Sequence, residues 1–281
     1  MFIDRHHQEY GVTFLCHYYG VSRSGYYAWQ HRPISHRCGA NRQLLCKIHH
    51  IHERSHGIYG SPRVWETLKL QGIACGENRV ARLMRHAGLT GRVVKVTRRQ
   101  PGLHRFFIAT PNLRQDQPAP QALDRQWVGD ITYLKARGRF CYLATVMDVC
   151  SRRILGHALG SDRSVNLTTR AVQQAIRSRP DHEDLLFHSD RGIEYAAYRY
   201  KALLGEHGIR SSMNRPGHPG DNAHMESFFH SMKAEWIRGK TFKTFTELEV
   251  AVRQYIRSYN HHRLHSGLDY RTPVEYERLY R

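Results

Sequence analysis

The sequence predicts an α/β domain preceded by an all-α region, and three observations support this fold class. Apolar residues recur at helical spacing through the first 90 residues, with glycine-containing turns between the segments. Short apolar runs typical of strands begin at residue 126. From residue 160 onward such runs alternate with helical segments. We therefore expect a helical region at residues 1–95, a linker rich in proline and glutamine at 96–120, and an α/β domain at 121–281.

The composition indicates a globular protein with a polyanionic partner. Of the 281 residues 40% are hydrophobic, and 43 Lys and Arg against 24 Asp and Glu give a net charge of +19. Because the basic residues are interleaved with apolar ones, folded nucleic-acid-binding surfaces are favoured over a basic tail. No run of 18 apolar residues exists and the N-terminus lacks the apolar core of a signal peptide, so we expect a cytoplasmic protein without membrane association.

The helical region is expected to contain two pairs of short helices. In the first pair, Gly20 separates two helices and Ser22 caps the second. In the second pair, Ser61 is the expected N-cap of a helix with Pro62 at its first position, and Gly72 follows the end of that helix. These signals set the boundaries of three of the four helices.

The fourth helix of this region is expected at residues 77–89. It places apolar residues on one face and arginines on the remainder. Two short helices joined by a glycine-containing turn are typical of a helix-turn-helix, in which Arg79 and Arg82 would reach phosphates or guanine edges of DNA. An ordinary helical hairpin with a charged exterior is the alternative.

The C-terminal part is expected to alternate strands and helices. The expected strands are residues 126–134, 140–149, 153–159, 184–190 and 209–214. The expected helices are residues 164–178 with Ser164 as cap, residues 198–207, a helix that follows a cap at Asp221, and residues 245–260. Three strands followed by alternating helices and strands is the element order of an RNase H-like fold. The order of the strands in space rests on this analogy.

Three acidic residues stand where such a fold would bring them together. Asp130 interrupts an apolar strand, Asp190 ends the fourth strand, and Glu226 lies in the first turns of the later helix. A buried charge is costly unless a cation compensates it. Three carboxylates without matching cysteine or histidine spacing suit Mg²⁺ or Mn²⁺, and a pair of such ions supports phosphoryl transfer. The sequence therefore predicts metal-dependent phosphodiester chemistry, with a solvated helix edge as the alternative for Glu226.

Longer segments around these acids resemble a known family. Thirty-five residues separate Asp190 from Glu226, and Lys233 follows seven residues later, which matches the D,D-35-E pattern of retroviral integrases and related transposases. The chain is similar to the second-frame (OrfB-type) transposases of insertion sequences that make their full enzyme by ribosomal frameshifting. The segments that carry the likeness are WVGDITYL, HSDRGIEY, NRPGHPGDNAHMESFFHSMKAE and YNHHRLHSGLDYRTPVEY, with YYGVSRSGYYAW and HGIYGSPRVWETL in the helical region.

The resemblance implies an integrase catalytic core that cleaves DNA at transposon ends and transfers the strand through its 3′-hydroxyl. In that case Asp130, Asp190 and Glu226 are the catalytic ligands of two Mg²⁺ or Mn²⁺ ions. Lys233 would contact terminal DNA, and Asn222 would orient the carboxylate or a phosphate. The implied partners are the terminal repeats and target DNA, the upstream-frame product or a fusion with it, and further copies of the chain on DNA at the nucleoid.

Other features leave alternatives open. Glu194 stands where relatives often have glutamine, and it either adds a charge beside Asp190 or faces solvent. Arg263 lies in a segment rich in histidine and tyrosine, residues 258–273, which suits contact with the DNA backbone or forms a solvated loop. Two other functions also fit: a non-catalytic DNA-binding regulator of transposition, and a metal-dependent nuclease that only hydrolyses.

Overall fold

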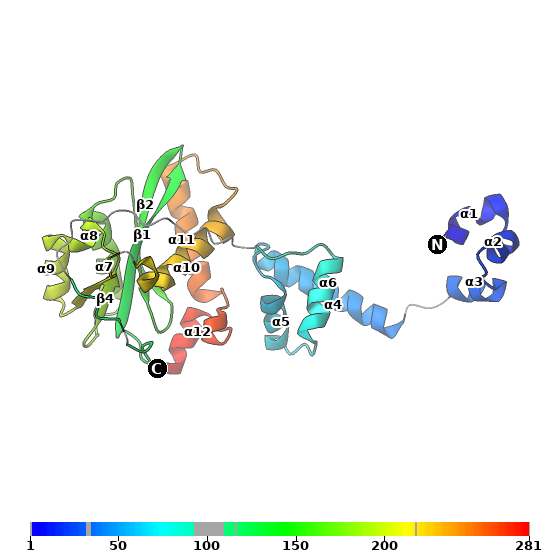
Figure 1. Ribbon diagram of the computed structural model, residues 1–281, viewed down its shortest axis with the longest axis horizontal. Helices are drawn as coiled ribbons and strands as arrows, with labels where there is room; N and C mark the ends of the chain where they lie inside the picture. The colour runs from blue at the N-terminus through cyan, green and yellow to red at the C-terminus, as the bar shows by residue number, and fades with distance from the viewer. Residues whose placement is uncertain (1, 32–34, 93–109, 116, 217, 281) are drawn as a thin grey trace. The chain divides into compact units, whose positions relative to one another are not determined.

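The chain forms two compact units, Met1–Thr90 and Gly91–Arg281 (Figure 1). The computed structural model describes residues 2–31, 35–92, 110–115, 117–216 and 218–280. Most of the predicted linker therefore lies outside the described residues. No helix in these ranges is long and apolar enough to cross a membrane.

The first unit is entirely helical, as expected. Its helices are α1 (Phe2–Tyr10), α2 (Val12–Tyr18), α3 (Arg23–Gln30), α4 (His36–Arg54), α5 (Ser61–Leu70) and α6 (Glu77–His86). The Ser22 hydroxyl accepts a hydrogen bond from the Gly25 N–H at 3.0 Å, which confirms the predicted cap of α3. The predicted cap at Ser61 is wrong by one residue. The Gly60 carbonyl already accepts the first helical bond, from Val64, so Gly60 is the cap residue and Ser61 begins the helix.

Two small cores hold these helices. Helices α1 to α3 pack around Ile3, Leu15, Cys16 and Tyr26. Helices α4 to α6 pack around a second cluster, formed by Leu44, Ile48, Ile51, Val64, Leu68, Val80 and Met84. Gly72 follows α5 at φ 73°, the left-handed conformation that glycine adopts without strain, and this turn leads toward α6. The α5–α6 pair is thus the predicted helical pair, and its apolar faces are buried against α4.

The second unit is built on a five-stranded mixed sheet. Its strands are β1 (Gln126–Ala136), β2 (Arg139–Asp148), β3 (Ile154–Gly160), β4 (Leu186–Ser189) and β5 (Arg210–Met213). Their order across the sheet is β3-β2-β1-β4-β5. The first three strands pair antiparallel, β4 runs parallel to β1, and β5 runs parallel to β4. This order and these directions confirm the predicted RNase H-like fold.

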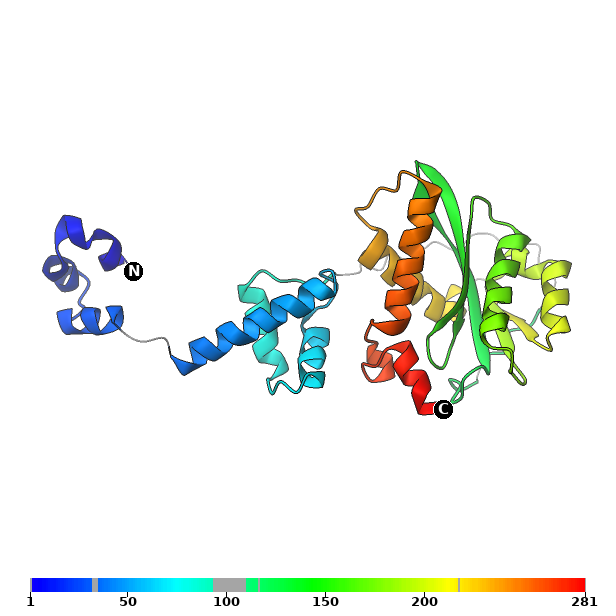
Figure 2. The same ribbon diagram turned by 180° about the vertical axis from the view of Figure 1, so that it is seen from behind.

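Helices cover both faces of the sheet (Figures 1 and 2). On one side lie α7 (Val165–Ser178), α8 (Ile193–Ala196) and α9 (Tyr198–Glu206); on the other lie α10 (Ala223–Met232), α11 (Phe245–His261) and α12 (Pro273–Glu277). Trp127 of β1 belongs to the core under α7 and α9, and Val128 to the core under α10 and α11. Alternate residues of β1 therefore face opposite layers, which directs Asp130 toward the α10 side.

The start of α10 differs from the sequence prediction. A short 3₁₀ turn, Pro219–Asn222, precedes the helix, and Asp221 does not cap it. The Asp221 carboxylate instead accepts hydrogen bonds from Arg215 Nη2 at 2.9 Å and Asn112 Nδ2 at 2.7 Å. The bond from Arg215 lowers the pKa of Asp221 to about 2. The predicted cap is wrong because the arginine competes successfully for this carboxylate.

The described end of the predicted linker packs against this unit. The Pro111 carbonyl accepts a hydrogen bond from the Met213 N–H at 3.3 Å, and the Leu113 N–H donates to Ser212 Oγ at 2.9 Å. Residues 110–115 thus run beside β5 rather than away from it. The three-part division at residues 95 and 120 stays a prediction.

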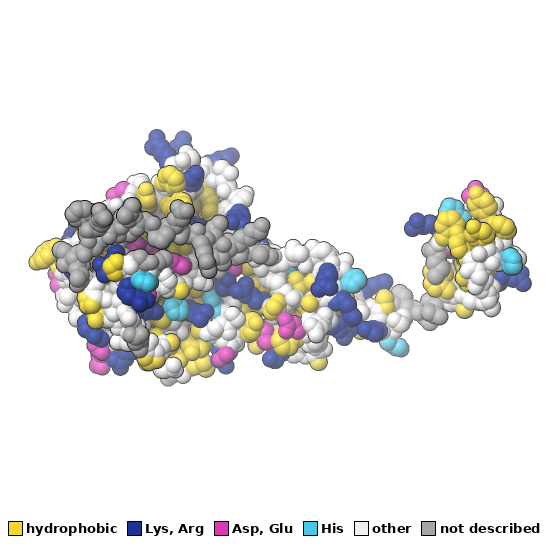
Figure 3. Space-filling view, viewed as in Figure 1, with side chains coloured by type: hydrophobic (Ala, Val, Ile, Leu, Met, Phe, Trp, Pro, Cys, Tyr) yellow, Lys and Arg dark blue, Asp and Glu magenta, His cyan; other side chains and the backbone are white. Residues whose placement is uncertain are grey.

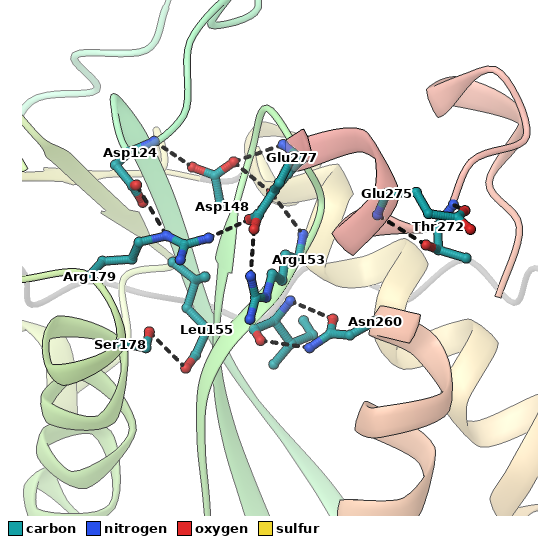
Figure 4. Close-up of polar contacts among 12 residues, drawn as sticks. Asp124, Asp148, Arg153, Leu155, Ser178, Arg179, Asn260, Thr272, Glu275 and Glu277 are labelled. Atoms are coloured by element: carbon teal, nitrogen blue, oxygen red, sulfur yellow. Dashed lines mark hydrogen bonds and ion pairs between the residues drawn. The ribbon is translucent and has the colours of Figure 1, made fainter. Parts of the chain in front are cut away.

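A buried polar cluster fastens α12 to the sheet (Figure 4). Glu277 of α12 accepts hydrogen bonds from Arg153, which follows β2, and from Arg179 Nη2 at 2.6 Å, at the end of α7. Arg179 also lies 3.2 Å from Asp124. Asp148 accepts from the N–H groups of Asp124 at 2.9 Å and Ser151 at 2.7 Å. The Glu277 carboxylate thus has two arginine partners inside the protein, so α12 is held in place by ion pairs as well as by apolar packing.

Asp148 should make stability depend on pH in an unusual direction. The side chain is buried, and burial raises its pKa from 3.8 to about 6. The folded state therefore binds the proton more tightly than the unfolded state, so this contribution to stability is complete only below the unfolded pKa of 3.8 and is lost as the pH rises through the folded pKa of about 6. We expect the loss to approach about 3 kcal/mol, since each pKa unit corresponds to about 1.4 kcal/mol.

Urea unfolding at a series of pH values, in the wild type and in Asp148→Asn, measures this effect. The difference in unfolding free energy between the two proteins should change by about 3 kcal/mol between about pH 3 and 7, because the other carboxylates are common to both. A constant difference would contradict the assignment.

Candidate active site

Asp130, which lies within β1, and Asp190, which directly follows β4, stand at the same level of neighbouring strands. Gly129 of β1 is the partner of Ser189 of β4 in the last pair of the parallel ladder, and each acid follows directly. The Asp130 Oδ1 atom accepts a hydrogen bond from the Ile131 N–H at 2.7 Å, and the side chain is half-buried. The register thus brings together two of the three predicted acids.

Asp190 is held in a tight turn after β4. Its Oδ1 atom accepts a hydrogen bond from the Gly192 N–H at 2.9 Å. A Cβ atom on Gly192 would lie 2.9 Å from this same oxygen and 2.7 Å from Glu194 Oε2, so a side chain at this position would displace both carboxylate ends. The turn therefore fixes the orientation of Asp190 through the backbone.

Glu226 stands on a helix that is anchored beside Asp130. Asn222, one helical turn before it, is buried and donates a hydrogen bond from Nδ2 to the Gly129 carbonyl at 3.1 Å. This contact fastens the start of α10 to β1, whereas the expected roles of Asn222 in orienting a carboxylate or phosphate and in contacting DNA stay predictions. Glu226 itself is exposed. Within the described residues no three His, Cys, Asp or Glu side chains lie close enough to hold a metal ion, so the structure pairs two acids and leaves the third on the neighbouring helix.

Sequence reasoning missed Arg163 at this site. Arg163 precedes α7, and its Nε donates to Glu194 Oε1 at 2.7 Å while its Nη2 lies 3.9 Å from Asp190 Oδ2. Glu194 is only 3% exposed, which excludes the solvent-facing alternative. Its second oxygen, Oε2, is buried without a hydrogen-bond partner among the residues that the structure describes. No spacing signal links residue 163 to residues 190 and 194, because the contact depends on the β3–α7 connection.

The electrostatics identify one acidic centre. Burial lowers the pKa of Arg163, but the Glu194, Asp190 and Asp130 carboxylates outweigh burial and raise it above its ordinary value. Burial raises the pKa of Tyr195 well above its ordinary value, and the same three carboxylates add to the rise. The centre is therefore a place where a cation is stabilised.

Lys233 lies just beyond the end of α10, in a π-helical turn that spans Lys233–Ile237. Its Nζ atom lies 4.5 Å from the centroid of the Tyr133 ring on β1, within the range of a cation–π interaction. The lysine is half-buried, so its head group is held near the same strand that carries Asp130. Contact with terminal DNA stays a prediction for this residue.

Arg263 is placed differently from the expectation. Its side chain is 11% exposed, and Nη2 and Nε donate to Glu235 at 2.6 and 2.9 Å. Nη2 also lies 3.3 Å from Ser231 Oγ. Burial lowers the pKa of Arg263, but the hydrogen bonds to Glu235 outweigh this and raise it. Because the guanidinium is used to pair a buried carboxylate, its placement favours an internal ion pair over the expected surface for the DNA backbone.

The two arginines predicted for DNA contact on α6 have different environments. Arg79 is half-buried, and its Nε donates to Asn41 Oδ1 of α4 at 2.9 Å. Arg82 is exposed, with Asn78 and Arg85 exposed one turn before and after it. Basic side chains gather over α4 and α6 on the face drawn in Figure 3. The structure thus favours Arg82 over Arg79 as a contact for DNA.

Three family models match the chain. Residues 120–219 and residues 207–273 match integrase core domains, and residues 40–97 match an HTH-like domain. The first two cover the five-stranded unit, and the third covers α4 to α6.

Curated relatives match over almost the full chain. The chain is 35% identical over 268 residues to the insertion element IS600 uncharacterized 31 kDa protein of Shigella sonnei, covering 95% of this chain and 98% of that protein. It is 32% identical over 284 residues to the transposase InsF for insertion sequence IS3A of Escherichia coli K12, covering 99% and 97%. Among solved structures, the HTLV-2 integrase catalytic core domain in complex with magnesium aligns with 54% of this chain and 95% of its own at a TM-score of 0.43 and 15% identity.

Proposed function

Because the chain belongs to the insertion-sequence transposases with an integrase core domain, we propose that Asp130, Asp190 and Glu226 are its catalytic carboxylates. The chain is a DDE-type transposase, and its function is DNA transposition. Two observations support the assignment of residues: the β1–β4 register puts Asp130 and Asp190 at the same level, and Asn222 fastens the helix of Glu226 to the residue before Asp130. Glu226, which stands on that helix, is the third carboxylate of the proposed set.

The residues at this centre fit a hard divalent cation. The donors are carboxylates without cysteine, which suits Mg²⁺ or Mn²⁺, and the centre already raises the pKa of a neighbouring arginine. We propose two ions held by Asp130, Asp190 and Glu226. When bound, such a pair activates the attacking oxygen and stabilises the leaving oxygen of an in-line phosphoryl transfer.

Other parts of the chain are proposed to position the DNA. The helix-turn-helix unit is proposed to bind the terminal repeats through α6, and Lys233 to hold the terminal strand near Asp130. Water attacks the phosphodiester at the transposon end and releases a 3′-hydroxyl. This hydroxyl then attacks a phosphodiester of target DNA, which forms the joining bond and displaces the 3′-hydroxyl of the target strand. We further propose that the chain acts as a homo-oligomer on DNA, together with or fused to the upstream-frame product.

The test is cleavage and strand transfer on a labelled duplex that carries the element's own end. We expect nicking and joined products with Mg²⁺ or Mn²⁺ and neither with EDTA. Cleavage without joining would indicate a hydrolytic nuclease. Binding without cleavage, also after fusion to the upstream-frame product, would indicate a regulator and would contradict the proposal.

Because Arg82 is exposed on α6, we predict that its replacement weakens DNA binding. Arg82→Ala should weaken binding to the element's end by roughly 1–3 kcal/mol and reduce the magnitude of the salt slope by about 1. Mobility-shift titrations at several salt concentrations measure both quantities. Arg253→Ala is the control, since it removes an exposed arginine of α11 that forms an ion pair with Glu249 one turn away. Equal weakening in both variants would show a general charge effect rather than contact through α6.

A further inference from the structure

Arg163 is shared unequally between two carboxylates. Its Nε lies 2.7 Å from Glu194 Oε1, within hydrogen-bond distance, whereas its Nη2 lies 3.9 Å from Asp190 Oδ2, beyond it. The three groups converge at Gly192, where a Cβ atom would lie within 3.0 Å of an atom from each of them. A small change in the position of the guanidinium would therefore convert the long contact with Asp190 into a direct one.

We propose that Glu194 is a positioning residue that raises the cation affinity of the Asp190 site by holding Arg163 away from Asp190. This inference rests on the proposed metal-binding role of Asp190. Neither the family pattern of three acids nor the spacing of the sequence assigns a role to this pair.

The physical reason is competition between cations. An arginine paired directly with Asp190 would occupy the negative charge that a divalent cation needs. Glu194 prevents this because its buried carboxylate makes a charge-assisted bond to Nε, which is stronger than a bond to a neutral acceptor. The Arg163 side chain is 44% exposed, so it has room to move once that bond is weakened.

The buried Oε2 atom of Glu194 supports the same conclusion. This oxygen has no hydrogen-bond partner among the described residues, although the carboxylate is almost fully buried. A carboxylate kept in this state is more costly than the amide of glutamine in the same space. Its negative charge is therefore the property that distinguishes this position, and the charge acts on Arg163.

The test measures Mn²⁺ binding to the full chain without DNA, from the loss of the free Mn²⁺ signal in electron paramagnetic resonance. Glu194→Gln should weaken binding about tenfold, in the range found for residues that orient metal ligands. The double variant Glu194→Gln with Arg163→Gln should restore binding to within about threefold of the wild type, because the competing cation is gone. Arg199→Gln, which removes an exposed arginine of α9, should change nothing.

A purely structural ion pair would behave differently. In that case the double variant would bind Mn²⁺ no better than Glu194→Gln, and this result would overturn the inference, as would unchanged binding in Glu194→Gln. If the wild type binds Mn²⁺ no more tightly than Asp190→Asn, the proposed metal site itself fails. Circular dichroism checks that each variant folds. Should Glu194→Gln not fold, Glu194→Asp with and without Arg163→Gln carries the same comparison, since the shorter acid also loosens its hold on the arginine.

Discussion

Asp190→Asn should abolish strand cleavage and strand transfer while DNA binding stays near the wild-type level. Asparagine keeps the size of the side chain and can still accept the hydrogen bond from the Gly192 N–H, which is 2.9 Å long in the wild type. It removes the negative charge that a hard cation requires. Since residues that only orient metal ligands cost 10–100-fold, loss of a direct ligand should lower the cleavage rate by more than about 10²-fold.

The measurement compares single-turnover cleavage with mobility-shift affinity on the same labelled end. Asp184→Asn is the matched control, because this acid precedes β4, is 69% exposed and forms an ion pair with the exposed Arg210. It should cleave at the wild-type rate. Equal loss of cleavage and binding in Asp190→Asn would count against a metal-ligand role, and residual cleavage within tenfold of the wild type would remove Asp190 from the catalytic set.

The fold could be predicted from the sequence wherever the signal is local. Strand and helix identities follow from apolar periodicity, and Ser22 and Gly72 mark helix boundaries through their own backbone chemistry. The predicted caps at Ser61 and Asp221 were wrong because other groups make the decisive hydrogen bonds. The Gly60 carbonyl accepts the first helical bond, and the Asp221 carboxylate accepts a bond from Arg215. The local sequence does not show which of several possible partners will form such a hydrogen bond.

At the candidate site, too, local signals could be predicted from the sequence and tertiary contacts could not. Asp130, Asp190 and Glu226 were predicted from strand context and the 35-residue spacing, and the register of β1 with β4 brings the first two to the same level of the sheet. Their catalytic role stays a prediction. Arg163 could not be found, because its role depends on where the β3–α7 connection passes the end of β4. Arg263 was placed on a DNA-facing surface for its neighbours in sequence, but its partner is Glu235, 28 residues away.

Gly156, like Arg163, has a structural role that the sequence alone does not show. It lies in β3 under α7, where a Cβ atom would be 2.1 Å from the Ala171 carbonyl oxygen and 2.8 Å from the Ala175 nitrogen. Both are backbone atoms of a helix that packs along the sheet, so neither can turn aside as a side chain would. The sequence shows only a glycine within an apolar strand, where a bulge or a close backbone approach is the general meaning.

Gly156→Ala should therefore destabilise the second unit by about 3 kcal/mol or more, the upper range for overpacking, because α7 must shift as a whole. This is a large share of the 5–15 kcal/mol typical of a folded domain, so we also expect poor solubility and loss of cleavage. Urea unfolding followed by tryptophan fluorescence measures the change. Gly205→Ala is the matched control, since an added Cβ in α9 meets open space, and alanine should stabilise that helix by up to about 1 kcal/mol. If both variants unfold at the wild-type urea concentration, the close approach of β3 to α7 is not what holds this face of the sheet.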